Sequence, residues 1–325
     1  MTNRRYVLAV VMFALLSIAA PRAGAWNSTG HELVAQIAFD QLTPAVKTYV
    51  VTLLKNHPRL NQDLLGDENR LADDNEAMFI RAATWPDMVR SPIDPMSRTE
   101  NHPRWHYVDF PIASDGLKEP APPLQWDGHS DPANLVQAMQ KAISELNNPQ
   151  TPKPRQAIDI CWVEHLVGDI HQPLHATSWF SNEYPMGDQG GNLDIIELPK
   201  QPPENLHFYW DAIEGMSMDP AQIRNTADRI EAEHPESQLK DQVADLSVVD
   251  WAHESFILAK TVAYENGNLP HSKRTPGTTL PSQAPELPAD YPAKSLATAD
   301  IRVALAGYRL AAVFTKLAAG QYPHP

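Results

Sequence analysis

Residues 154–175 read PRQAIDICWVEHLVGDIHQPLH and predict a helix that carries polar groups on one face. Proline is favoured in the first turn of a helix and disfavoured in its interior, so Pro154 begins the helix and Pro173 ends or kinks it. His165 and Asp169 are four residues apart and therefore project from the same face, and His175 follows the break. Two imidazoles and a carboxylate in so short a run are the ligand types of zinc.

Other parts of the chain supply matching ligand types. His207 and Asp211 repeat the four-residue spacing on a second predicted helix. Each of these residues alone is more typical of a packed or surface position, and the first cluster alone is compatible with a buried polar network. Buried polar groups without partners cost free energy, however, and rarely crowd together. The whole set of candidate ligands is too large for one tetrahedral ion: His31, Asp87, His106, His165, Asp169, His175, His207 and Asp211.

Residues 1–25 have the features of a cleavable secretory signal. Arg4 and Arg5 give a basic start, residues 6–20 are apolar, and Ala23-Gly24-Ala25 is a small-residue cleavage site. The apolar run is short for a membrane span, so an uncleaved anchor is the weaker alternative. We expect the mature chain, residues 26–325, to have no stable membrane association.

Cleavage after Ala25 would free the α-amino group of Trp26. A neutral amine and the carbonyl of the same residue can form a chelate, and His31 lies close enough in sequence to add an imidazole. The alternative is that Trp26 only anchors the N-terminus in the core, and the spacing alone favours this alternative.

The composition excludes several kinds of function. The formal net charge of −14 argues against non-specific binding to a nucleic-acid backbone, although a metal site would reverse the field locally. The single cysteine, Cys161, rules out an intramolecular disulfide. The chain has no glycine-rich phosphate loop and no Gly-x-Ser-x-Gly nucleophile motif.

The apolar periodicity along the chain is mainly helical, which predicts a mainly α fold. Residues 192–198 alternate like a strand and are interpreted as one arm of a small β-hairpin. Residues 91–130 and 269–293 resemble loops, and we interpret the second as a surface excursion within one domain. The predicted helices lie near 29–42, 44–56, 74–83, 131–146, 154–172, 206–214, 220–232, 248–265 and 297–319.

The motifs from Trp26 to Asp211, in their order and approximate spacing, resemble those of the S1/P1 nuclease family. The resemblance implies a single-domain, α-helical fold of the phospholipase C/P1 nuclease type with three clustered zinc ions (Zn²⁺). The matching motifs are Trp26-x4-His31, Trp-Pro-Asp87-x2-Arg90, His106-Tyr-Val-Asp109, His165-x3-Asp169 through His175, Gly190-Gly191-Asn192 and His207-x3-Asp211.

The family pattern assigns each predicted ligand to an ion. Asp169 would bridge two of the three ions, and His171, which is not a family ligand, would serve in packing or support. The three implied ligand sets are Asp87, His106, His165 and Asp169; His175, His207 and Asp211; and the Trp26 amine and carbonyl with His31 and Asp169.

The resemblance also implies an activity on single-stranded RNA and DNA, with 5′-phosphate products and 3′-nucleotidase activity. Asp87, Arg90 and Asp169 would be catalytic, with Asp87 orienting the attacking water and Arg90 contacting a phosphate oxygen. An exposed arginine at a helix end is an equally simple interpretation of Arg90. No obligate protein partner is evident.

Three further residues would bind the substrate. Tyr107 would stack on a base, Asp109 would accept a hydrogen bond from the base edge, and Asn192 would contact the nucleotide. The alternatives are a buried aromatic for Tyr107 and a turn-stabilising residue for Asn192.

Two other functions fit part of the pattern. A zinc-dependent phospholipase C shares the N-terminal tryptophan and the His-x3-Asp-x5-His run, but it carries glutamate where this chain has Asp211. A non-catalytic periplasmic zinc-binding protein needs neither Arg90 nor an aromatic and acidic pocket. The chain lacks the cysteines of fungal and plant family members, which together with the predicted signal peptide indicates a bacterial periplasmic or secreted protein.

Overall fold

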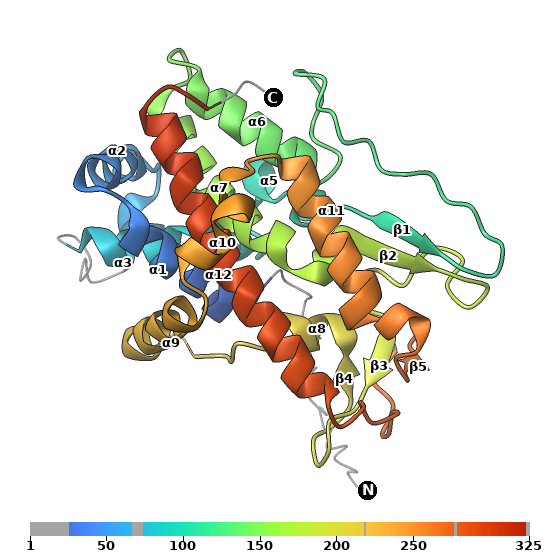
Figure 1. The fold of residues 1–325 in the computed structure, drawn as a ribbon. Coiled ribbons are helices and arrows are strands. Elements are labelled where there is room, and N and C mark those ends of the chain that lie inside the picture. The colour runs from blue at the N-terminus through green and yellow to red at the C-terminus, as the bar shows by residue number, and fades with distance from the viewer. Residues whose placement is uncertain (1–25, 67–73, 218, 276–277, 323–325) are drawn as a thin grey trace, which may run out of the picture.

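Two long helices, α7 (Lys153–His171) and α12 (Tyr291–Ala318), form the centre of the fold. Every residue of α7 from Gln156 to His171 is buried, so this helix is enclosed on all sides and not only along one stripe. The helices α1 (Ser28–Gln41), α2 (Pro44–Leu54) and α6 (Leu135–Asn147) pack against it together with α12 (Figure 1).

The computed structural model describes residues 26–66, 74–217, 219–275 and 278–322. The predicted signal peptide, residues 1–25, lies outside them. Within them the prediction of a mainly α-helical fold with a small β component is confirmed. The remaining helices are α3 (Asn75–Ala82), α4 (Trp85–Met88), α5 (Ser97–Glu100), α8 (Leu206–Asp211), α9 (Pro220–Glu233), α10 (Glu236–Ala244) and α11 (Val248–Leu258).

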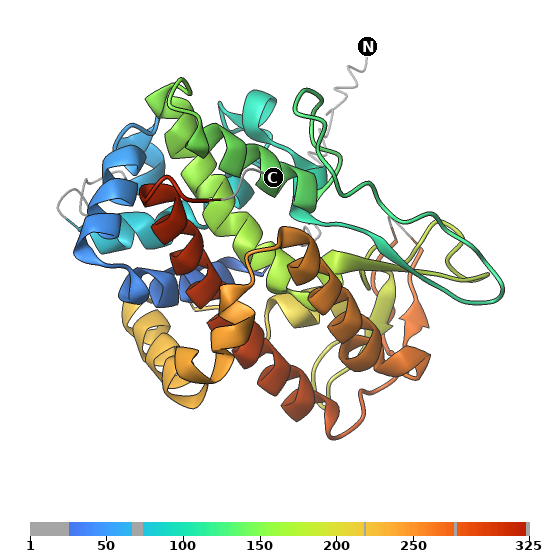
Figure 2. The ribbon, with the colours of Figure 1, turned by 45° about the horizontal axis from the view of Figure 1, so that its top comes forward.

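Two small sheets lie on one side of the helices (Figures 1 and 2). β1 (Phe110–Ala113) runs parallel to β2 (Thr177–Phe180). β3 (Asp194–Ile196) pairs with β4 (Glu204–Asn205), as predicted for a hairpin, and also with β5 (Ser272–Lys273), so this sheet has three strands.

Several predicted boundaries differ from the observed ones. The segment 91–130, predicted as a loop, contains α5 and β1, because β1 pairs with a strand far away in sequence. The helix α10 was not predicted, since only Leu239 and Val243 of it are buried and the apolar period is short. α12 begins at Tyr291 and not near Ala297, because Pro292 lies in its first turn, where proline is tolerated. α11 ends at Leu258 and continues as a π-helical turn over 259–263.

No helix among the described ranges combines the length and the hydropathy that a membrane crossing requires.

The first helix and α12 approach closely because Gly307 has no side chain. A Cβ at this position would lie 2.5 Å from Ile37 Cγ2 and 2.6 Å from Ile37 Cβ. Backbone contact at this point brings α1, and with it His31, against the centre of the fold.

We predict that Gly307→Ala lowers the free energy of unfolding. Overpacking costs about 1–3 kcal/mol, which exceeds the gain of about 1 kcal/mol from replacing glycine in a helix. Chemical denaturation measures the change. In the double variant with Ile37→Ala, the contact with Cγ2 is removed while the contact with Cβ remains, so the clash is partly relieved and the two effects should be less than additive. A Gly307→Ala protein as stable as the wild type, or strictly additive effects, would contradict the close contact.

Candidate metal centre

The predicted ligands come from six segments that converge beside α7. His165 and Asp169 lie on one face of α7, as their spacing predicts. His175 lies in the 3₁₀ turn Pro173–Ala176, which begins where α7 ends at Gln172. The other segments are α1 with His31, α4 with Asp87, the turn Pro103–His106 with His106, and α8 with His207 and Asp211.

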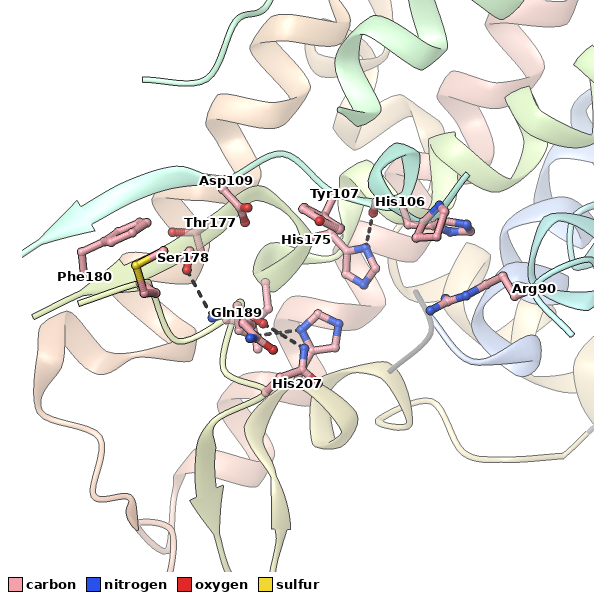
Figure 3. A pocket seen from close by; sticks show the side chains of 15 residues that line it. Arg90, His106, Tyr107, Asp109, His175, Thr177, Ser178, Phe180, Gln189 and His207 are labelled. Carbon is pink, nitrogen blue, oxygen red and sulfur yellow. Dashed lines mark hydrogen bonds between the residues drawn. The ribbon is translucent and has the colours of Figure 1, made fainter. Parts of the chain in front are cut away.

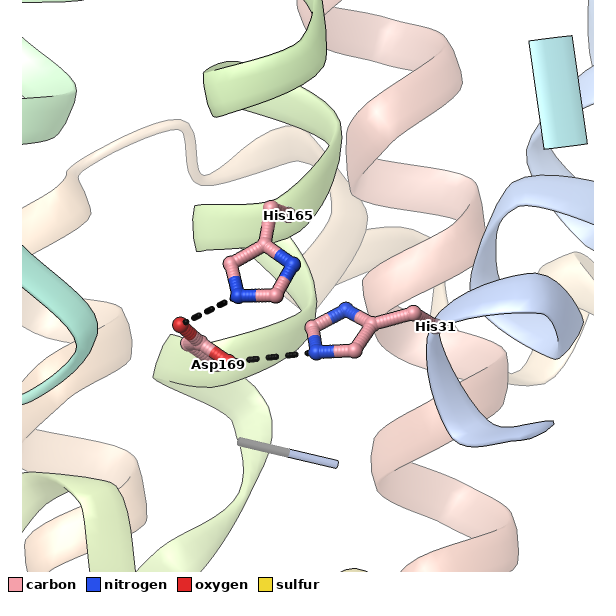
Figure 4. A group of neighbouring side chains, drawn as sticks. All are labelled: His31, His165 and Asp169. Atoms are coloured by element: carbon pink, nitrogen blue, oxygen red, sulfur yellow. Dashed lines mark ion pairs between the residues drawn. The ribbon is translucent and has the colours of Figure 1, made fainter. Parts of the chain in front are cut away.

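The first group consists of His31, His165 and Asp169, all completely or almost completely buried (Figure 4). Asp169 lies between the two histidines, with Oδ1 3.4 Å from His31 Nε2 and Oδ2 3.3 Å from His165 Nε2. The two imidazole rings are stacked with centroids 3.9 Å apart. Three potential ligand atoms therefore converge within the distances that one ion requires.

The second group adds Asp87 and His106 to His165. His106 Nδ1 lies 2.9 Å from His165 Nε2 and 3.2 Å from Asp169 Oδ2. Asp87 Oδ1 lies 3.8 Å from His106 Nδ1 and 3.9 Å from His165 Nε2. Asp169 thus contacts residues of both groups, and its role as a bridge between two ions stays a prediction.

The third group consists of His175, His207 and Asp211. Asp211 Oδ1 is 3.6 Å from His175 Nε2, and Oδ2 is 3.6 Å from His207 Nε2. Gln172 donates a hydrogen bond of 2.8 Å to Asp211 Oδ1, which fixes the carboxylate.

Backbone carbonyls orient three of the histidines. The Nδ1 atoms of His165, His175 and His207 lie 2.8, 2.6 and 2.7 Å from the carbonyl oxygens of Ala83, His106 and Gly190. A carbonyl only accepts, so each Nδ1 carries the proton and each Nε2 presents its lone pair to the cluster. This is the arrangement by which proteins orient metal-binding imidazoles.

Several of the inward-facing atoms are buried and meet no hydrogen-bond partner in the described residues, which fits a site built for cations. Burial raises the pKa of Asp169 well above its usual range, and the Asp87 and Asp211 carboxylates add to this effect. Burial also lowers the pKa of His165 and of His175 to about 4. The unpartnered atoms that face the cluster are His31 Nε2, His175 Nε2, Asp169 Oδ1 and Asp211 Oδ2.

Gly168 makes room for His31. A Cβ on Gly168 would lie 2.6 Å from His31 Nδ1 and 3.0 Å from Cε1. The imidazole therefore lies directly against the backbone of α7, beside Asp169.

Trp26 lies next to this centre. Its side chain is completely buried, and the backbone N–H of Asn27 donates to the carbonyl of Asp211 at 3.0 Å. Asn27 caps α1 by accepting a hydrogen bond from the Gly30 N–H. The predicted ligation by the Trp26 amine requires cleavage at Ala25, which lies outside the described residues, and stays a prediction.

A cavity of about 230 Å³ opens beside the histidines (Figure 3). Tyr107, Asp109 and Asn192 all line it, as does Arg90, so the structure brings the predicted substrate residues together. Tyr107 is 38% exposed and is not the buried aromatic of the alternative interpretation. Asn192 does bond within its own turn, to the carbonyl of Gln189.

Arg90 lies at the end of the cavity near the histidines (Figure 3). Its NH1 donates a hydrogen bond of 3.0 Å to Asp87 Oδ1. The side chain of Arg90 is 22% exposed and that of Asp87 is 26% exposed, so this pair is open to solvent. The predicted side-chain ligands other than Asp87 are buried.

His171 points away from the cluster. Its Nδ1 donates to the carbonyl of Val167, and its Nε2 accepts from the buried Arg309. This position agrees with the interpretation of His171 as a packing and supporting residue.

Sequence reasoning missed Asp188, which holds the loop behind His207. Its buried carboxylate accepts from the backbone N–H groups of Trp179, Gly190 and Gly191 and from the hydroxyl of Tyr264. A lone aspartate before two glycines is a common turn signal, so the sequence offers no specific hint of this role.

Comparison with known proteins agrees with this geometry. A family model described as S1/P1 Nuclease matches residues 26–319. Nuclease S1 from Aspergillus oryzae is 25% identical over 189 residues, which are 57% of this chain and 53% of the relative. Endonuclease 1 from Arabidopsis thaliana is 25% identical over 214 residues, 65% of this chain and 60% of the relative.

Endonuclease 4 from the same plant is 30% identical over 180 residues, 51% of this chain and 52% of the relative. The chain thus spans between 52% and 60% of the length of these curated relatives. The family model covers nearly all of the described residues, and the chain therefore belongs to the S1/P1 nuclease family.

Proposed function

We propose that this protein is a zinc-dependent phosphodiesterase that hydrolyses single-stranded RNA and DNA to 5′-phosphate products and removes the phosphate of 3′-nucleotides. The observation that carries the proposal is the convergence of buried imidazoles and carboxylates, with unpartnered inward-facing atoms, beside an open cavity. Membership of the family supports the nuclease class.

The proposed cofactor is three zinc ions. When bound, they would lower the pKa of water and attract the phosphoryl oxygens as Lewis acids. The donor set of imidazole nitrogens and carboxylate oxygens suits zinc. The residues proposed to hold the ions are Asp87, His106, His165 and Asp169; His175, His207 and Asp211; and the Trp26 amine and carbonyl with His31 and Asp169.

Asp87 and Arg90 are proposed to act on the phosphate. The carboxylate of Asp87 is open to solvent at one side and can accept a hydrogen bond from the attacking water, which orients it. Arg90 donates through NH1 to Asp87 and lines the end of the cavity, and we propose that its guanidinium binds a non-bridging phosphate oxygen there.

Tyr107, Asp109 and Asn192 are proposed to hold the nucleoside whose 3′-oxygen leaves. The exposed ring of Tyr107 offers a stacking surface, and a stacked base contributes about 1–3 kcal/mol regardless of sequence. A duplex hides its base faces, so the proposed site favours single strands. The predicted signal sequence supports a periplasmic or secreted location for the enzyme.

Incubation of the processed protein with substrates tests the activity. We expect chelator-sensitive cleavage of single-stranded DNA and RNA and phosphate release from a 3′-nucleotide. Chromatography of the products should reveal 5′-phosphate ends. Cleavage of phosphatidylcholine alone would identify a phospholipase C, and zinc binding without turnover would identify a storage or binding protein.

Asp169→Ala should reduce the zinc content by more than one ion per chain and lower the activity to background, because the carboxylate faces two groups of ligands. Metal analysis and a nuclease assay on the same preparation measure both effects. His129→Ala, at an exposed position outside the cluster, is the control. A wild-type zinc content in Asp169→Ala would refute the bridging position.

Gly168→Ala should weaken zinc binding by roughly 10- to 100-fold, as the loss of supporting contacts does at other metal sites. The added methyl group displaces His31, although alanine favours the helix itself. Zinc titration against a competing chelator measures the affinity, and circular dichroism checks the fold. Cys161→Ala, another buried change on α7, should bind zinc normally. If Gly168→Ala bound zinc as tightly as the wild type, zinc binding would not depend on the placement of His31 against Gly168.

A further inference from the structure

The lining of the cavity beside the histidines extends past Tyr107 and Asp109 to Phe180. In Figure 3, Arg90 and His106 lie at one end, Tyr107 lies in the middle beside His175 and His207, and Phe180 lies at the far end beyond Asp109. Met186 lines the same cavity. The far end is thus apolar, while the near end carries the candidate metal ligands.

We propose that Phe180 and Met186 form a second nucleobase subsite, which takes the base of the next nucleotide on the 5′ side of the nucleoside at Tyr107 and Asp109. The inference rests on the proposed function and adds to it a preference for substrates of at least two nucleotides.

Neither side chain is needed to fill the core. Met186 is 87% exposed, and Phe180 is only partly buried and belongs to neither of the hydrophobic clusters of the described residues. Large apolar side chains that are exposed next to one another are typical of sites that a ligand or partner covers. Tyr107, the other exposed large residue of this cavity, is the proposed stacking residue of the first subsite.

The backbone holds this apolar end at a set distance from Asp109. Phe180 is the last residue of β2 and pairs with Ala113 of β1, whose first residue follows Asp109 directly. The carbonyl of Phe180 also accepts a hydrogen bond of 2.9 Å from the Ser114 N–H. The pairing of β1 with β2 therefore couples the two proposed subsites.

Gly187 brings the loop that carries Met186 against Phe180. Its φ of +81° favours glycine, and a Cβ there would lie 2.3 Å from Ser178 Oγ and 3.1 Å from Phe180 Cζ. The phenyl ring of Phe180 thus lies against the backbone next to Met186, and we infer that the thioether and the ring can contact one base.

The charge distribution favours a base over a phosphate at this end. Of the residues that line the cavity, only Arg90 is a lysine or arginine, and it lies at the opposite end (Figure 3). The nucleoside at Tyr107 directs its 3′-oxygen to the candidate metal ligands, so its 5′ side continues towards Phe180. The occupant at Phe180 and Met186 is therefore the base of the 5′ neighbour.

The test compares phosphate release from two substrates by the zinc-loaded protein. One is 2′-deoxyadenosine 3′-phosphate, and the other is the corresponding dinucleotide 3′-phosphate with an uncleavable, uncharged methylphosphonate linkage. We expect kcat/KM to be roughly tenfold higher for the dinucleotide, through KM, since one stacked base readily supplies such a factor.

In the variants Met186→Ala and Phe180→Ala, the ratio of the two kcat/KM values should fall towards one. Ile257→Ala removes an exposed apolar side chain of α11 that does not line the cavity, and it should retain the tenfold ratio. A wild-type ratio near one, or an unchanged ratio in both cavity variants, would overturn the second subsite while leaving the hydrolase intact. Failure to release phosphate from either substrate would overturn the proposed function and this inference with it.

Discussion

The structure depends on a carboxylate that is completely buried among imidazoles. Asp169 lies in the middle of the enclosed helix α7, and burial raises its pKa well above the usual range. Neighbouring histidines are poor sources of compensating charge, because burial lowers the pKa of His165 to about 4. A divalent cation among these groups would remove the conflict, since it stabilises the carboxylate and uses the neutral imidazole lone pairs. Without a bound cation, burying these polar groups costs free energy. As ligands of a cation, the same groups are satisfied.

The need to orient the histidines around the buried Asp169 carboxylate explains the positions of short irregular segments around α7. The carbonyls that orient the histidines belong to Ala83 at the end of α3, His106 in a 3₁₀ turn and Gly190 in a loop. Two of these segments also bury large apolar side chains, Phe79 in α3 and Trp105 in the 3₁₀ turn. Each is held by its own polar anchor, of which the buried Asp188 carboxylate behind Gly190 is an example. The ligand geometry is thus a product of tertiary structure and not of the helices alone.

The sequence predicts those features of the site that depend on a local or repeated spacing of residues. The four-residue spacings of His165 with Asp169 and of His207 with Asp211 predict pairs on helix faces, and the structure has both pairs on helices. The contacts that complete the site are non-local and leave no periodic signal. The space beside Gly168 depends on a histidine of α1, and an isolated glycine in a helical pattern does not indicate its neighbour. The pairing of β1 with β2 joins segments that no local pattern connects, and for this reason the segment before β1 resembled a loop.

For the proposed activity on nucleic acid, an acidic protein needs a local source of attraction for an acidic polymer. The chain carries a formal charge of −14, and Arg90 is the single lysine or arginine along the cavity. Counterion release through many basic contacts, which dominates binding to nucleic-acid backbones elsewhere, is therefore a small contribution here. The attraction has to come from cations at the buried ligands for one phosphate and from base stacking for the rest of the chain. Stacking needs exposed base faces, so the charge of the protein and the residues of the cavity both support the proposed preference for unpaired strands.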